Sequence, residues 1–322
     1  MSRVRFERDD DRVRVLVDGA PFTAYLFPAA DPVLTKPAFY PVRTAGGTAV
    51  TRGYPLETRP GERTDHPHHV GAWLAYGDVD GIDFWNNSPA VDDGDGYGRI
   101  RHRGVERTNG GEGSGRLSVR GDWTAPDGTV LLEEATTVRV LAGEDRRAID
   151  RETTLTAARD VDLPDDKEGL CGLRVRRGLE HPTDEPVTLT DRHGGETTVT
   201  PGDDDAVSGE YLTSAGVRGV EAWGSRAEWV RLAGDVEGDP VSVTLMDHPD
   251  NVGHPTGWHA RGYGLFAANP LGRAVFTDGA ERLDYGLDDG GSTTLRYRLA
   301  LDDGVPDAEA LAERYDAFAD SA

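Results

Sequence analysis

The chain has 322 residues, with 58 Asp and Glu against 35 Lys and Arg, and a formal net charge of -23. Arg supplies nearly all of the basic charge, since Lys36 and Lys167 are the only lysines. Acidic surfaces keep proteins dispersed in concentrated salt, so the composition predicts a halophilic protein. A face that binds a nucleic-acid backbone needs a basic patch, and the sequence contains none, so we expect no nucleic-acid partner.

A single cysteine, Cys171, excludes an intrachain disulfide, and its neighbours Leu170 and Gly172 favour a small buried residue. The charged segment 1–11 lacks the apolar stretch of a secretory signal. No run approaches the roughly 18 apolar residues that span a bilayer. We therefore expect a cytoplasmic protein with no membrane partner.

Most of the chain alternates polar and apolar residues in short runs, which is the pattern of antiparallel strands with one wet face. The run Arg12–Val17 ends at Asp18-Gly19, a strong hairpin signal. Strands of the same type are predicted at 136–141, 151–157, 187–190, 241–246 and 293–301. With 41 glycines and 19 prolines spread throughout, the sequence predicts one large all-β domain over residues 1–322.

One helix is predicted, at the C-terminal end of the sequence. Leu311, Tyr315 and Phe318 recur at helical spacing behind a start marked by Pro306-Asp307. We expect this helix to pack on the sheets and to carry no chemistry.

Six of the nine histidines fall in two short segments, Asp65-His66-Pro67-His68-His69 and residues 247–259. Imidazole moves protons or holds metals near neutral pH, so this clustering indicates a functional site. If a strand runs through 65–76, alternation places His66 and His68 on one face and His69 on the other with Trp73. Pro67 cannot donate a ladder hydrogen bond, which favours a sheet edge or rim.

The second segment contains Asp247, His248, Asn251, His254, Trp258 and His259. Because Asp-His-Pro occurs in both segments, we predict that the two segments line one cleft. His-X-His on a strand can ligate a metal, but the spacing is not diagnostic. A divalent or transition metal therefore remains an alternative, and no cofactor is assigned.

A third segment places Lys167 between Asp166 and Glu168, with Arg174 downstream at strand spacing. A lysine retained in a chain almost without lysine indicates a need for a compact ammonium group, and the alternative is an exposed ion pair. Trp73 and Trp258 accompany the polar segments, where an indole can stack on a sugar ring or fill the core.

These motifs, taken together, resemble a microbial family labelled "PmoA-like" or "methane oxygenase PmoA". The resemblance is strongest over residues 36–272 and rests on several ordered motifs. They are the first histidine segment with Trp73, Gly77-Asp78-Val79 and Asp83-Phe84-Trp85; Lys167-Glu168-Gly169-Leu170 with Arg174; and Trp223-Gly224, Met246-Asp247-His248-Pro249-Asp250-Asn251, Pro255, Trp258-His259 and Asn269-Pro270.

The resemblance implies a large antiparallel two-sheet supersandwich, similar to galactose mutarotase, in a sugar-related setting. The methane-oxidising subunit that lends the family its label is an integral membrane protein, so we do not expect methane oxidation from a chain without a membrane-spanning run. Val70 stands where the family tends to carry a basic residue, which removes any anion contact at that position.

We predict a carbohydrate-active protein, an epimerase, lyase or hydrolase acting on a sugar or oxidised sugar by histidine acid–base chemistry. Asp65 and Asp247 would orient imidazoles, and Lys167, Glu168 and Arg174 would contact substrate oxygens. The predicted catalytic residues are His66, His68, His69, Lys167, Glu168, Asp247 and His248. The predicted substrate contacts are Asp65, Trp73, Arg174, Asn251, His254, Trp258, His259 and Asn269. The alternatives are a non-catalytic sugar-binding module and a metal-dependent oxygenase.

The charge of -23 generates a first prediction. Removing salt restores repulsion among the carboxylates, because the Debye length grows from about 3 Å at molar salt to about 30 Å at 0.01 M. We expect the melting temperature to fall when salt is removed, measured by differential scanning fluorimetry. A melting curve that does not move between these salt concentrations would contradict the prediction.

Overall fold

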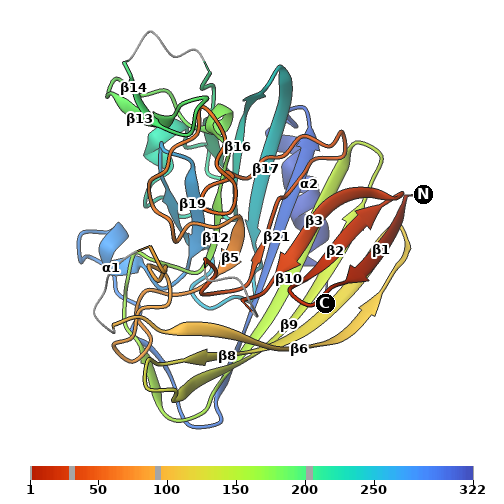
Figure 1. Cartoon of the computed structure of the whole chain (residues 1–322). Helices are drawn as coiled ribbons and strands as arrows, with labels where there is room; N and C mark the ends of the chain where they lie inside the picture. The colour runs from red at the N-terminus through yellow and green to blue at the C-terminus, as the bar shows by residue number, and fades with distance from the viewer. Residues whose placement is uncertain (1, 29–32, 91–95, 201–205, 322) are drawn as a thin grey trace.

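The computed structural model describes residues 2–28, 33–90, 96–200 and 206–321. Over these residues, two large antiparallel sheets dominate the chain (Figure 1). The first sheet has nine strands in the order β18 (Gly257–Ala260), β19 (Leu265–Asn269), β12 (Cys171–Arg174), β5 (Ala72–Leu74), β4 (Ala38–Phe39), β3 (Ala20–Leu26), β2 (Arg12–Val17), β1 (Arg3–Arg8) and β7 (Gly111–Glu112).

The second sheet has eight strands within the described part of the chain. Their order is β15 (Glu210–Thr213), β16 (Trp229–Val236), β17 (Asp239–Asp247), β21 (Ser292–Asp303), β10 (Arg146–Ala157), β9 (Val130–Ala142), β8 (Ser114–Thr124) and β6 (Arg99–Asn109). Two small pairs join β11 (Val161–Leu163) to β20 (Tyr285–Leu287) and β13 (Val187–Thr190) to β14 (Glu196–Val199). The helices are α1 (Arg273–Phe276), α2 (Ala308–Ala319) and the 3-10 turns η1 (Arg177–Leu179) and η2 (Gly219–Ala222).

The strands follow the alternation of the sequence. In β2 the buried side chains are Val13, Val15 and Val17, and they alternate with more exposed positions. All six predicted strands lie within observed ones, namely β2, β9, β10, β13, β17 and β21. The predicted all-β, antiparallel two-sheet fold with a C-terminal helix is confirmed.

The two large sheets pack face to face around one core. A cavity of about 30 Å³ between them is lined by Ala72 and Cys171 of the first sheet and by Leu245, Tyr297 and Leu299 of the second. Apolar side chains from both sheets form a single buried cluster around it. The outer face of each sheet is therefore available for a covering helix or a functional site. Among the described residues, no helix is long and apolar enough to cross a membrane.

Helix α2 covers part of the outer face of the second sheet and lies behind the strands in the view of Figure 1. The Asp307 side chain caps its N-terminus by accepting a hydrogen bond from the backbone N–H of Ala310 (2.8 Å). Leu311, Tyr315 and Phe318 pack on the outer face, in a cluster that also contains Trp229, Met246 and Leu212. The predicted start of the helix and its packing face are both as expected.

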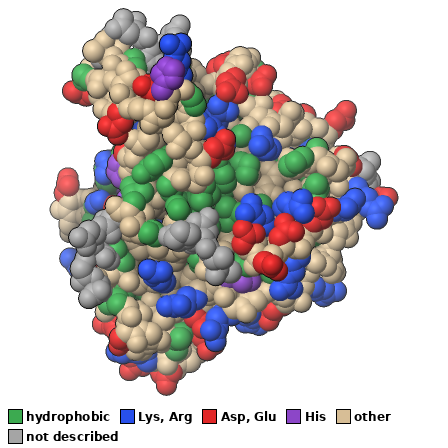
Figure 2. Space-filling model, in the orientation of Figure 1, with side chains coloured by type: hydrophobic (Ala, Val, Ile, Leu, Met, Phe, Trp, Pro, Cys, Tyr) green, Lys and Arg blue, Asp and Glu red, His purple; other side chains and the backbone are tan. Residues whose placement is uncertain are grey.

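Figure 2 shows the molecule in the orientation of Figure 1, from the side away from α2. Apolar side chains gather near the centre of this view, and acidic and basic side chains interleave toward its right edge. The β1–β2 hairpin contributes such pairs, with Arg12 on Asp11 (2.6 Å) and Arg14 on Asp9 (3.0 Å). Exposed pairs of this kind contribute little to stability.

A buried polar network lies on the inner face of the second sheet. Glu134 of β9 accepts hydrogen bonds from Arg151 of β10 (2.8 Å), from the Trp123 indole (2.9 Å) and from the Thr136 hydroxyl (2.6 Å). The Arg151 Nε atom donates to the Thr153 hydroxyl (2.9 Å). A charge pair buried between sheets is tolerated because these bonds replace water on both partners.

This network generates a second prediction. Glu134→Gln leaves the Arg151 charge buried without a counter-ion, so we expect a loss of about 3 to 5 kcal/mol in the free energy of unfolding. The matched control is Glu134→Leu combined with Arg151→Met, which removes both charges and should cost much less. Urea unfolding measures both. Equal losses in the two proteins would contradict this account.

Candidate active site

The candidate site lies on the outer face of the first sheet, over β18, β19, β12 and β5. Trp73 pairs with Gly172, Gly172 with Ala267, and Ala267 with His259, so these positions share one face. Cys171 points the other way, into the cavity between the sheets. The face that carries Trp73 and His259 is therefore turned away from the second sheet.

A tight turn, rather than a strand, brings the first three histidines together. The backbone N–H of His69 donates to the carbonyl oxygen of His66 (3.0 Å), and His66 has a φ of 45°. Strand β5 begins only at Ala72, so the predicted alternation of His66 and His68 against His69 is wrong. The ring centroids lie 5.7 Å (His66–His68), 4.9 Å (His66–His69) and 4.3 Å (His68–His69) apart.

The turn is held by two buried arginines that share one carboxylate. Asp65 Oδ1 accepts hydrogen bonds from Arg52 (2.7 Å) and Arg174 (2.7 Å). Arg52 also donates to the backbone oxygens of Asp65 (2.8 Å), His66 (2.9 Å) and His69 (3.3 Å). Burial opposes the ionisation of Asp65, but its contact with His66 and the charges of Arg174 and Arg52 hold its pKa well below the usual value.

His66 is the most solvent-accessible imidazole of the turn, with 38% of its side chain exposed. Its Nδ1 atom lies 3.3 Å from Asp65 Oδ1. One face of the ring stacks on His69, and Tyr263 stacks on it at 5.0 Å between centroids. Arg174 in turn lies over the Tyr263 ring, 4.7 Å from its centroid. An exposed imidazole held by a carboxylate and fixed by ring stacking suits proton transfer.

Glu168 and Lys167 approach this region from the loop before β12. Lys167 is exposed and pairs with Glu168, and Glu168 Oε2 lies 3.6 Å from His259 Nδ1. Arg261 donates to His259 Nε2 (3.2 Å). The Asn269 amide nitrogen donates to the backbone oxygen of Asp166 (2.7 Å), which anchors the loop that carries Glu168. Asn269 is fully buried, so it positions this loop. The predicted contact between Asn269 and a substrate does not fit this place.

Aromatic rings connect these two groups of side chains. His69 stacks on Trp73 (5.3 Å), Trp73 contacts Trp85 (5.0 Å), and Trp85 stacks on His259 (6.5 Å). Trp223 meets His259 edge to face (4.9 Å), and Arg261 covers its ring. Among the described residues, His68 Nδ1 and the indole nitrogens of Trp73 and Trp85 are buried without a hydrogen-bond partner. His66 Nδ1 and His259 Nδ1 are also buried without a hydrogen-bond partner in the described part of the chain. Buried polar atoms are rarely left unpaired, so this cluster has the capacity to bind water or a polar ligand.

Burial keeps most of these imidazoles neutral. Burial, together with the charges of Lys36 and neighbouring groups, lowers the pKa of His68 to about 2. Burial and the charges of Arg261 and Lys167 lower the pKa of His259 to about 3. Burial also places the pKa of His69 well below its usual value. Neutral imidazoles beside a carboxylate can accept a proton or hydrogen-bond a hydroxyl group.

The second Asp-His-Pro segment does not reach this site, so the prediction of one shared cleft is wrong for His248 and His254. The His248 ring contacts Phe318 of α2 at 5.2 Å, on the outer side of the second sheet. His254 Nδ1 donates to Asp247 Oδ2 (2.8 Å), and His254 Nε2 lies 3.5 Å from the Tyr315 hydroxyl. Both sheets separate these residues from His66. Only the end of the segment, His259, crosses to the site face.

Asp247 and its partners form a hydrogen-bonded cluster at the end of β17. Asp247 is fully buried and accepts hydrogen bonds from the Asn251 amide (2.7 Å) and the Thr256 backbone N–H (3.1 Å). Asn251 also bonds both backbone groups of Arg296 (2.7 Å each). These bonds satisfy the turn that carries the chain from one sheet to the other. The predicted catalytic role of Asp247 and ligand role of Asn251 therefore do not fit their places.

Three further predicted substrate contacts are inaccessible. Trp258 is fully buried, faces the space between the sheets and donates its indole N–H to Ala227 O (2.9 Å). Arg174 and Trp73 lie on the site face but beneath other side chains, with 0% and 1% exposure. Arg174 acts on the site through Asp65, His69 and Tyr263 rather than by touching a ligand.

Sequence reasoning missed Arg52, Tyr263 and Lys36 as parts of the site. Lys36 is buried, and donates to Trp85 O (2.7 Å) and Asn87 Oδ1 (2.6 Å), and its charge reaches His68. Burial lowers its pKa to about 7. Its signal was the rarity of lysine, whereas Arg52 was one arginine among many. Among the described residues, no group of three or more His, Cys, Asp or Glu side chains is arranged to hold a metal ion.

The fold and the site together define a class, a two-sheet antiparallel β-sandwich with a histidine-rich site on the outer face of one sheet. The chain belongs to the family of unknown function DUF6807, whose match covers residues 12–316. No curated protein matches it in sequence.

Galactose mutarotase-like proteins are among its structural neighbours. One, from Clostridium acetobutylicum, is 10% identical, with a TM-score of 0.40 over 93% of this chain and 98% of that one. Another, from Lactobacillus casei, is 10% identical, with a TM-score of 0.33 over 92% and 99%. A candidate aldose 1-epimerase from Escherichia coli K12 is 12% identical, with a TM-score of 0.31 over 93% and 98%.

The neutral imidazoles generate a third prediction. A histidine in an unfolded chain has a pKa of about 6.5, so below that pH the unfolded chain binds protons at His68 and His259. In the folded protein both residues stay neutral down to about pH 3. Their effect on stability is absent above pH 6.5 and becomes increasingly unfavourable to the fold as the pH falls. Each contributes a slope of up to about 1.4 kcal/mol per pH unit.

We therefore expect the free energy of unfolding of His68→Asn to fall less steeply than that of the unaltered protein between about pH 6.5 and pH 5. Urea unfolding at constant high salt measures the slopes. The matched control is His193→Asn, on an exposed loop, which should keep the steeper slope. Parallel slopes for all three proteins would show that His68 is not held neutral.

Proposed function

We propose that this protein is a carbohydrate-active enzyme that acts on a sugar or oxidised sugar by acid–base chemistry. The observation that carries the proposal is the exposed His66 imidazole, held by Asp65 beside buried ring nitrogens that lack partners. Epimerisation, elimination and hydrolysis each need a positioned acid and base. His66 with Asp65 supplies one such group, and Glu168 beside His259 supplies the other.

The surroundings of these groups support a polyhydroxylated substrate. Tyr263 and Trp223 are partly exposed aromatic side chains, and such rings pack against the apolar faces of small ligands. His68 Nδ1, Trp73 Nε1 and Trp85 Nε1 are buried, so they can contribute to ligand binding through bridging water. The sugar-related setting implied by the PmoA-like resemblance agrees with this proposal.

Charge supports an oxidised sugar among the candidates. Arg52 and Arg174 place two guanidinium charges against the single carboxylate of Asp65. The buried region beneath the histidine turn therefore carries excess positive charge within an acidic protein. A substrate carboxylate at the surface above it would be favoured electrostatically.

In this mechanism His66 exchanges a proton with the substrate while Asp65 stabilises the imidazolium that forms. The two buried arginines hold Asp65 ionised, so it cannot itself take up the proton near neutral pH. His69 and Tyr263 keep the ring plane of His66 fixed by stacking on it. Glu168 serves as the second proton-transfer group.

The fourth prediction tests this assignment. NMR spectroscopy of a panel of neutral sugars, uronates and aldonates should reveal turnover of at least one compound. On that compound, His66→Ala should lower kcat by about 100-fold or more with little change in affinity, because a proton-transfer group acts mainly in the transition state. The matched control is His193→Ala, which should leave kcat unchanged.

Isothermal titration calorimetry on the same variants separates the enzyme from a sugar-binding module. A module would bind a panel member without converting it, and His66→Ala would then lose affinity with no kcat to lose. Binding without conversion, or full turnover by His66→Ala, would refute the proposed mechanism.

A further inference from the structure

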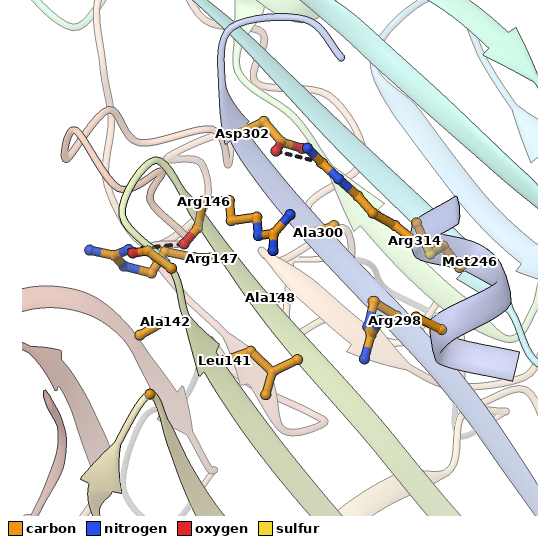
Figure 3. A pocket seen from close by; sticks show the side chains of 13 residues that line it. Leu141, Ala142, Arg146, Arg147, Ala148, Met246, Arg298, Ala300, Asp302 and Arg314 are labelled. Atoms are coloured by element: carbon orange, nitrogen blue, oxygen red, sulfur yellow. Dashed lines mark hydrogen bonds and ion pairs between the residues drawn. The ribbon is translucent and has the colours of Figure 1, made fainter. Parts of the chain in front are cut away.

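A second cavity, of about 310 Å³, lies on the opposite side of the molecule from the histidine site (Figure 3). It opens on the outer face of the second sheet, beside α2. In register, Ala148 pairs with Ala300 and Arg146 with Asp302, so these side chains share that face. Small residues, among them Gly143 and Ala317, leave the space unfilled.

The floor of this cavity is apolar. Leu141, Ala148, Met246 and Ala300 line it, and Met246 is fully buried. Ligand pockets are typically about 300 to 1,000 Å³ and mostly apolar, with a few placed polar groups. This cavity therefore has room for a compact molecule with an apolar body.

Four arginines and one aspartate line the rest of the cavity, and two of the arginines already have carboxylate partners. Arg298 makes a two-point contact with Asp150 (2.6 and 2.8 Å), and Arg314 donates to Asp302 (2.7 Å). Arg147 donates instead to the backbone oxygens of Gly143 and Arg146. Arg147 lies on the opposite face of β10 from Arg146 and Ala148, so among the described arginines that line the cavity Arg146 is the one on the cavity face that has no carboxylate hydrogen-bonded to it.

Arg146 is the unusual member of this set. Figure 3 shows its side chain extending toward the middle of the cavity, between Asp302 and Arg298. No residue in the described part of the chain forms a hydrogen bond or ion pair with its guanidinium group. Arg146 is exposed, whereas Asp302 Oδ2 is buried without a hydrogen-bond partner among the described residues. Polar atoms left open around an apolar floor indicate a ligand that supplies both kinds of contact.

We propose that this cavity binds a compact organic carboxylate with an apolar body. The carboxylate lies on Arg146, whose planar fork matches carboxylate geometry, and the apolar body lies on Leu141, Ala148 and Met246. In a chain with a net charge of -23, a site that presents a guanidinium group without a hydrogen-bonded carboxylate favours anions against the surrounding field. The proposal is independent of the histidine site and its chemistry.

The fifth prediction is tested by isothermal titration calorimetry with octanoate as the probe, at constant moderate salt. We expect octanoate to bind at one site, and 1-octanol and octylammonium to bind at least about tenfold more weakly, because a charge-assisted hydrogen bond is lost. Arg146→Gln should weaken octanoate binding by about tenfold without changing octanol binding. Ala148→Ile, which fills the floor, should weaken both.

The matched control is Arg101→Gln, on the exposed surface of β6, which should bind octanoate as the unaltered protein does. Circular dichroism verifies that each variant is folded. Absence of octanoate binding would overturn the proposal. So would equal binding of octanoate and octanol, or an Arg146→Gln effect no larger than that of Arg101→Gln, since either result would leave Arg146 without a role.

Discussion

The site depends on one carboxylate shared by two buried guanidinium groups. Asp65 accepts hydrogen bonds from Arg52, in the preceding loop, and from Arg174 of β12. Arg52 also donates hydrogen bonds to three backbone oxygens of the turn. Removing one member of a buried charge group leaves the others uncompensated, at a cost of about 3 to 5 kcal/mol. The turn that carries the histidines has few ladder hydrogen bonds of its own. Its conformation, including the left-handed backbone at His66, is imposed by these contacts.

The sandwich separates two kinds of histidine that look alike in sequence. On the outer face of the first sheet, His66 is partly exposed and contacts the buried His68 ring, and both lie among rings and unpaired nitrogens. Beyond the end of β17, by contrast, the His248 ring packs on Phe318 of α2. His254 hydrogen-bonds to Asp247 and contacts Tyr315 of α2. The first arrangement leaves hydrogen-bonding groups free for a ligand, whereas in the second these groups bond to other residues of the protein. Satisfaction of hydrogen bonds distinguishes the two more reliably than residue type does.

Charge is distributed against the overall composition. Carboxylates dominate the surface, yet arginines gather beneath the histidine turn and around the cavity beside α2. At molar salt, exposed charges act over only about 3 Å. Buried or partly enclosed cations are screened much less. Recognition of anions in such a protein is therefore expected in enclosed places rather than on open surfaces.

The sequence alone determined the secondary structure and the regions that carry polar chemistry. Period-two alternation in β2 and β21, and helical spacing of Leu311, Tyr315 and Phe318, report local backbone geometry that neighbouring residues settle among themselves. The tertiary structure alone decided which polar residues meet. Strand order brings His259 near His66, sends His248 across both sheets and buries Trp258 between them, because each depends on strands far apart in the chain. The turn at His66 shows the same limit: it is stabilised by Arg52 and Arg174, and no local pattern contains those contacts.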